Sequence, residues 1–269
     1  MRKSLRKARS IFVRDVRLAY SYVLTFWTGF FGTAGQAITF YFVAKLVAPT
    51  ASFGTAGHAM SYFEYVAVNL AFMRFQSAAT TSFQRAVRND QMMGTTEALM
   101  VTPTELPLMI ASAGLWPFAL AAIQIVVFLA VSMPLGLHLD HVDGVSLTAF
   151  TILTVLVMSP LGILAGAGIM SFKQELPTGL LVGGLASLLG GVLFPISKLP
   201  EALQRVAWLL PITHSLNGVR GAVVGASLWQ LRADAVWLLV VSLVLVPLSL
   251  YVFARAVRRT KIDGTLGDY

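Results

Sequence analysis

The chain has 269 residues, of which 57% are hydrophobic and only 12% are charged, whereas soluble domains carry about 25% charged residues. This composition excludes an ordinary soluble globule, because too few polar side chains are present to cover its surface. The net charge is +8, but seven of the twenty Lys and Arg residues lie in the first seventeen positions. Such clustering is typical of a chain end held against an anionic membrane surface rather than of a nucleic-acid-binding face.

The first seventeen or so positions predict an amphipathic helix that lies on the membrane surface. Within 2–18, apolar residues recur at spacings of three and four, and basic residues fall on the opposite side. Because the apolar face is narrow, a solvated basic tail is the alternative interpretation.

Long apolar runs follow one another along the rest of the chain. The first, 20–46, has no charged residue before Lys45 and at about 1.5 Å per residue exceeds the ~30 Å hydrocarbon core of a bilayer. The second run contains two charged residues, Glu64 and Arg74. We therefore expect one domain over 1–269, an all-α integral membrane protein with six transmembrane helices at 20–46, 59–80, 106–133, 145–171, 176–194 and 233–254.

The distribution of basic residues predicts the orientation of these spans. The N-terminus, 81–105, 172–175 and the C-terminus hold fourteen Lys and Arg, whereas the connections on the other side hold five. Because basic residues are retained on the cytoplasmic side, both termini are expected there.

Glu64 and Arg74 are costly inside a span, and such residues usually have a function. They are ten residues apart, or about 15 Å along a helix, so they cannot pair with each other. We expect Glu64 near the outer end, where Lys45 or the segment after the fifth span can meet it, or where it is simply exposed. For Arg74 the alternatives are a functional role and a side chain that extends to the cytoplasmic interface.

The cytoplasmic connection between the second and third spans is the longest polar stretch on its side. Gly94 can end one helical piece, Thr95 or Thr96 can cap a short helix through Glu97, and Pro103 stops propagation. A short protruding helix predicts a docking element, with an ordinary loop as the alternative.

The outer connection 195–232 is too apolar for a loop in water and too interrupted for a span. Pro200 and Pro211 divide it into short helical pieces, and Trp208 and Trp229 suit the membrane interface. We expect re-entrant helices that line or cap a substrate path, because irregular backbone at membrane depth must be packed in protein or face a wet cavity.

Two sequence patterns carry a family resemblance. The first is Gly94-Thr-x-Glu97-x-Leu99 followed by Thr102-Pro103, and the second is Phe194-Pro195-Ile-Ser, Leu199-Pro200, Leu210-Pro211-Ile-Thr-His214 and Arg220. At this spacing in a six-span chain, they resemble the ABC-2 family of transporter permeases, and within it the subgroup of daunorubicin-type drug-export and nodulation-factor-export permeases. The likeness covers nearly the whole chain.

The resemblance implies a permease subunit of an ABC exporter that moves an amphiphilic drug, glycolipid or lipid-linked glycan across a bacterial cytoplasmic membrane. It would work with a separate ABC ATPase, a second permease copy or close paralogue, and membrane lipids. Residues 85–103 would be the coupling helix in a cleft of the ATPase, and 196–226 the outer re-entrant helices. The coupling residues implied are Arg85, Arg88, Asp90, Gly94, Thr95, Glu97, Leu99 and Pro103, and those of the translocation path or gate are Glu64, Phe194, Pro195, Pro200, Pro211, His214 and Arg220. Relatives often carry more charge than Asn89-Asp90-Gln91-Met92-Met93, so the fine ATPase contacts stay open.

The chemistry of an enzyme has little support in the sequence. No G-x-x-x-x-G-K-S/T motif occurs, so ATP and Mg would bind the partner subunit and this chain would hold no cofactor. No carboxylate pair or nucleophile with a base indicates catalysis, and the His and Asp residues of 138–143 predict a solvated loop rather than a metal site. The rivals are an ion-driven secondary transporter, which would need broken helices in two repeated halves, and a lipid-modifying membrane enzyme.

Overall fold

The computed structural model describes residues 12–13, 16–17, 23–47, 52–55, 58–92, 106–172, 183–184 and 188–262. Most of the expected interfacial helix 2–18 and of the fifth span 176–194, and the coupling residues Gly94, Thr95, Glu97, Leu99 and Pro103, lie outside these residues. The described part of the chain is mostly helical, with one two-stranded hairpin.

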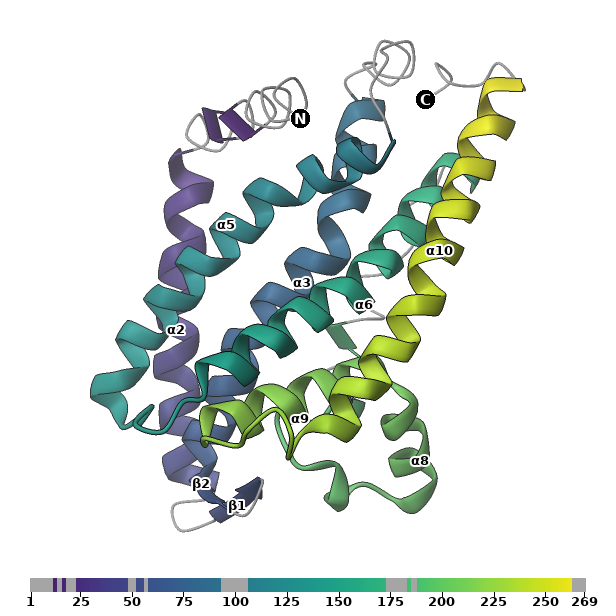
Figure 1. Ribbon diagram of the computed structural model, residues 1–269. Coiled ribbons are helices and arrows are strands. Elements are labelled where there is room, and N and C mark those ends of the chain that lie inside the picture. The colour runs from purple at the N-terminus through teal and green to yellow at the C-terminus, as the bar shows by residue number, and fades with distance from the viewer. Residues whose placement is uncertain are drawn as a thin grey trace.

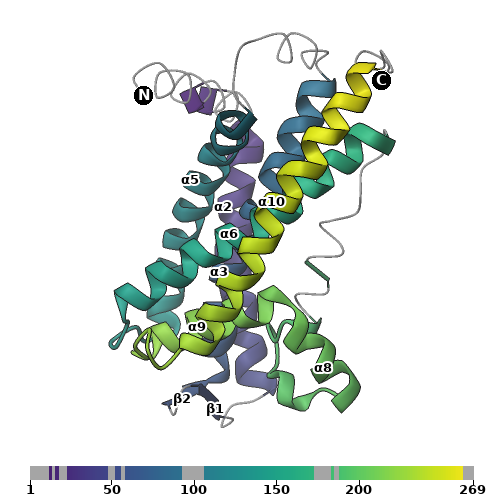
Figure 2. The ribbon, with the colours of Figure 1, turned by 45° about the vertical axis from the view of Figure 1, so that its right-hand side comes forward.

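The long helices run between the two ends of the bundle, with α6 and α10 in the same direction (Figure 1). They are α2 (Val23–Val47), α3 (Tyr62–Met92), α5 (Leu106–Ser132), α6 (Gly144–Phe172) and α10 (Arg232–Ile262). Helix α2 begins and α10 ends at one end of the bundle, which we call the terminal end. The opposite end, called the hairpin end, holds β1 (Ser52–Thr55), β2 (His58–Ser61), α8 (Glu201–Leu209) and α9 (Pro211–Val223), and Figure 2 shows the same division after rotation.

Length and composition allow three of the described helical segments to cross a membrane. They are Gly114–Leu135, Gly144–Met170 and Arg232–Thr260. At about 1.5 Å per residue, the shortest of them is ~33 Å long. The chain is therefore a multi-pass membrane protein with an all-α architecture in its spans. The helices α2 and α3 are long enough but more polar, α3 because it contains Glu64, Arg74 and further charges near its end.

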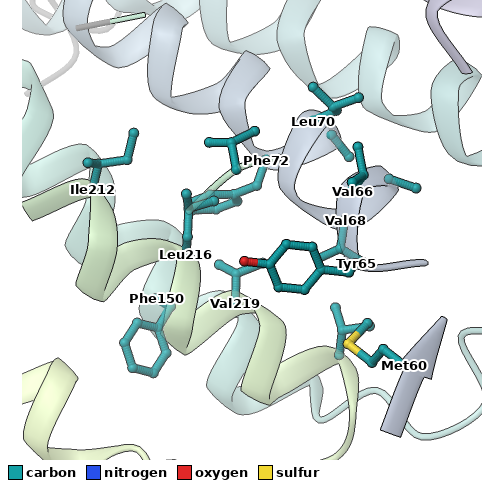
Figure 3. Close-up of a cluster of buried hydrophobic side chains, with 14 of the residues drawn as sticks. Met60, Tyr65, Val66, Val68, Leu70, Phe72, Phe150, Ile212, Leu216 and Val219 are labelled. Atoms are coloured by element: carbon teal, nitrogen blue, oxygen red, sulfur yellow. The ribbon is translucent and has the colours of Figure 1, made fainter. Parts of the chain in front are cut away.

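Helix α6 is the centre of the bundle and packs against α3, α9 and α10. Gly162 of α6 permits the closest approach to α3, because a Cβ there would stand 2.2 Å from the carbonyl oxygen of Thr80. The main apolar core lies where α3, α6 and α9 meet, and Figure 3 shows Tyr65 of α3 with its hydroxyl turned toward Leu216 and Val219 of α9.

Two segments differ in form from the sequence expectations. Helix α3 continues without a break to Met92, so Arg85 and Arg88 stand on its last turns and are not part of a separate helix. Residues expected in the outer connection 45–58 and at the start of the second span form the antiparallel strands β1 and β2, in which Phe53 pairs with Met60. The hairpin delays the start of α3 to Tyr62.

Candidate functional site: the buried helix α9 and its polar contacts

Helix α9 is enclosed by the bundle along almost its whole length. Pro211 fits its first turn, where no backbone N–H donor is needed, and small residues on the helix allow neighbouring helices to come close. A Cβ added to Gly218 would stand 2.0 Å from the Phe150 ring of α6, so only glycine fits there. Eleven of the twelve positions from Ile212 to Val223 are buried, and polar residues are among them.

Arg220 is the most buried charged residue of α9, with 4% of its surface exposed. Its Nε donates to the Leu216 carbonyl at 3.1 Å, its Nη1 donates to the Tyr65 hydroxyl and to the Gly191 carbonyl at 3.2 Å, and its Nη2 donates to the Asn217 side-chain oxygen. Asp234 attracts it at longer range. The guanidinium is thus held from every side by the protein.

The chain segment at Gly191 and Val192 is fastened to the same cluster. Gly191 has φ +72°, a conformation that favours glycine, and its carbonyl accepts from the Tyr65 hydroxyl at 2.5 Å. Asn69 donates to the Val192 carbonyl at 2.9 Å. Arg220 therefore joins α9 to α3 and to the residues before Phe194. Tyr65, Asn69 and Asn217 were not among the expected site residues.

His214 forms a second polar cluster on α9, where α10 begins. Its Nδ1 lies 2.5 Å from a carboxylate oxygen of Asp234, its Nε2 lies 2.9 Å from the Trp208 carbonyl, and its ring stacks on Trp237 at 4.2 Å. Burial disfavours the charged imidazole, but the hydrogen bonds to Asp234 and Trp208 outweigh that effect and raise the pKa of His214 above its ordinary value. His214 links α8, α9 and α10.

The prolines of the expected gate stand at element boundaries. Pro200 precedes the first residue of α8, and Pro211 is the first residue of α9. Phe194 and Pro195 are half-buried in irregular backbone just before the short 3-10 helix η2 (Ile196–Lys198). The four residues therefore delimit the hairpin-end helices rather than gather around one point.

Glu64 has different partners from those expected. It accepts from the backbone N–H of Ser61 at 2.8 Å, while Ser61 Oγ accepts from the backbone N–H of Glu64 at 3.2 Å, a capping box that begins α3. Its other carboxylate oxygen lies 3.1 Å from Nδ1 of His138, in the turn after α5. Lys45 instead lies over the Tyr41 ring. Glu64 therefore stabilises the start of α3. Its hydrogen-bond partners in the described residues are Ser61 and His138, and neither belongs to α8 or α9.

Arg74 lies between α2, α3 and α5, in the middle of α3. Its Nη2 donates to Gln36 Oε1 at 2.6 Å, and its Nη1 is 3.5 Å from Gln124 Oε1. Its Nε is buried without an acceptor. Because both partners stand near the middle of their own helices, the side chain does not extend to the cytoplasmic interface.

The residues expected for ATPase coupling are described only in part. Arg85 is exposed and Arg88 half-buried on the last turns of α3, and Asp90 belongs to the same helix. These turns reach the terminal end of the bundle, where the basic turn of α10 with Arg255, Arg258 and Arg259 also ends (Figure 1). In the described residues, no group of three His, Asp or Glu side chains is arranged to hold a metal ion.

Comparison with known proteins identifies one family. The sequence model of the ABC-2 type transporter family matches residues 7–224, which is most of the chain and includes α2 to α9. No curated protein matches the chain.

Proposed function

The chain belongs to the ABC-2 type transporter family, and from this premise we propose that it is the permease subunit of an ABC exporter driven by a separate ATPase. The family makes the chain a membrane transport component. The ATP-driven partner, the export of an amphiphilic substrate and the daunorubicin or nodulation-factor subgroup are parts of the proposal. ATP and Mg would bind the partner, and two permease copies would form one transporter.

The observation that carries this proposal is the division of the molecule into two unlike ends. Arg85 and Arg88 of α3 reach the same end as the basic C-terminal turns of α10. Clusters of basic residues remain on the cytoplasmic side of a bacterial membrane. The end of α3 would therefore lie on the cytoplasmic side, where an ATPase could push on it, and we expect both chain termini on that side.

The hairpin end suits an outer gate. Helix α8 exposes several apolar side chains, among them Trp208 and Leu209, and buries only Ala207. Helix α9, in contrast, is enclosed and is connected to α3 and α10 through Arg220 and His214. A tilt of α3 or α10 at the terminal end would therefore displace α9 at the opposite end, because long helices and their polar contacts move as units. This is how ATPase closure would open or shut the outer path.

The experiment is capture of the tagged chain from its host membranes in mild detergent, with mass spectrometry of what comes with it. We expect an ABC ATPase. Arg85→Glu should lower its recovery about tenfold, the result of losing ~1.4 kcal/mol of binding free energy. Glu97→Arg or deletion of 90–97 should abolish it while membrane insertion persists.

The matched control is Arg205→Glu, which makes the same charge change at an exposed position of α8 at the hairpin end. This variant should recover as much ATPase as the parent chain. Equal losses for Arg85→Glu and Arg205→Glu, or capture without any ABC ATPase, would overturn the assignment.

A further inference from the structure

We propose that Arg74, Gln36 and Gln124 bind the phosphate group of an amphiphilic ligand within the membrane. This inference rests on the proposed export function and narrows its substrate class to phosphorylated amphiphiles, against cationic drugs. Its basis is the positive charge of Arg74, which has no counter-charge within the protein.

The positive charge of Arg74 has no carboxylate at its depth. The helices that surround it, α2 and α5, contain no acidic residue at all. All twelve Asp and Glu residues of the chain lie near or outside the ends of the expected spans, at 15, 64, 90, 97, 105, 140, 143, 175, 201, 234, 263 and 268. A second copy of this chain therefore has none to offer either. The Phe128 ring lies 5.8 Å from the Cζ of Arg74 but carries no negative charge. A guanidinium without a counter-charge in hydrocarbon is costly, so a negative group from another molecule is the natural partner.

The hydrogen-bonding groups of the cluster are suited to an anion. Gln36 accepts one strong bond from Arg74, but the contact to Gln124 is long at 3.5 Å, and the Nε–H has no acceptor. A guanidinium has five N–H donors, and the amide nitrogens of both glutamines add more. Phosphate oxygens can accept several such bonds at once, and charge-assisted bonds of this kind are about twice as strong as neutral ones.

The surface of α2 beside Gln36 is open to a lipid-like molecule. Gly32 and Gly35 lie within one turn of Gln36, both are exposed, and no atom would stand within 4 Å of a Cβ at either position. Phe31 and Phe42 are exposed apolar side chains of the same helix. A phosphate at Arg74 would thus continue into an acyl chain along this surface.

The test uses the full-length chain in phosphatidylcholine nanodiscs without an ATPase, titrated with fluorescent dioleoyl phosphatidic acid. We expect Arg74→Gln to weaken its binding at least about tenfold, as for loss of a charge-assisted contact, and Arg74→Lys to restore part of it. Arg255→Gln, an exposed arginine near the end of α10, is the matched control and should leave binding unchanged. Unlabelled phosphatidic acid should compete, whereas inorganic phosphate should not if the acyl chain contributes.

A second variant, Gln36→Glu, places a carboxylate of the same shape beside Arg74. It should expel phosphatidic acid while raising the unfolding temperature, since the ion pair then forms within the protein. Unchanged binding in both Arg74→Gln and Gln36→Glu, or an equal loss in Arg255→Gln, would overturn the inference. Competition by inorganic phosphate at the same concentration would overturn its lipid source. Because no ATPase is present, such a failure would leave the capture of an ATPase as an independent result.

Discussion

Two arginines of the helical bundle are held in different ways. Arg220 is 4% exposed, and a phenol, an amide and two backbone carbonyls accept from it. Arg74 has one short hydrogen bond, one long one and a buried Nε–H without an acceptor. The first guanidinium is satisfied by the protein and joins helices, whereas the second is left with capacity for a ligand. The two arginines thus differ in their N–H donors. Those of Arg220 have acceptors within the protein, which makes it structural, whereas those of Arg74 are only partly satisfied, which leaves it able to bind a ligand.

The largest loss of stability is expected from Arg220→Leu. The change leaves the Gly191 carbonyl and the side chains of Tyr65 and Asn217 with fewer partners, and each unsatisfied buried group costs about 1–3 kcal/mol. We expect a loss of at least about 3 kcal/mol, measured as thermal unfolding of the purified protein in detergent. The exposed α8 variant Arg205→Leu serves as control. If Arg220→Leu melted like the parent protein, Arg220 would not be structural.

A smaller loss, of about 1–3 kcal/mol, is expected from Gly218→Ala, because the added methyl overlaps the Phe150 ring. The control is Gly32→Ala on α2, where a Cβ meets nothing and alanine favours the helix by up to about 1 kcal/mol. Unfolding temperatures of the two variants should move in opposite directions. The double variant with Phe150→Leu should recover part of the loss, and no recovery would place the clash elsewhere.

The His214 cluster should make the free energy of unfolding depend on pH. Because folding raises the pKa of His214, its contribution is fully present below the ordinary value near 6.5 and is lost as pH rises through the raised folded-state value. Unfolding measured from pH 6 to 9 should show this decline in the parent protein. In His214→Gln the decline should disappear, and an identical pH profile in both proteins would exclude His214 as its source.

The smallest effect on stability is expected from Arg74→Gln, within about 1 kcal/mol. The variant loses one strong hydrogen bond but also removes an unpaired charge from the membrane interior, and the two effects oppose each other. The thermal unfolding temperatures of Arg74→Gln and Arg220→Leu, measured side by side, test this comparison directly. Equal destabilisation by the two variants would mean that both arginines are structural.

Local signals in the sequence predicted where the two short helices of the hairpin end begin. Pro200 and Pro211 indicated where the short helices begin, and α8 and α9 start at Glu201 and Pro211. For Glu64 we expected Lys45, the outer segment or simple exposure, whereas it forms the capping box Ser61-x-x-Glu64, a local signal that our sequence interpretation did not use. A carboxylate three residues after a serine can be held by the helix terminus itself, without a partner from a distant segment.

Contacts between distant parts of the chain could not be predicted. Asn69 meets Val192 across 123 residues, and Tyr65 meets Arg220 across 155. Neither pairing has a local signature, since it depends on how α3 and α9 pack around α6. For the same reason the sequence left two alternatives for Arg74, and only the positions of Gln36 and Gln124 exclude its extension to the interface.

The position of Arg74 has a consequence for biogenesis. An arginine at the centre of a helix opposes its insertion through the translocon by about 2.5–3.5 kcal/mol, so α3 is a poor membrane segment by itself. Helix α2 is synthesised first, and its Gln36 can accept the arginine as soon as α3 emerges. With β1 and β2 joining them in a short hairpin, we expect α2 and α3 to enter the bilayer as a pair during synthesis.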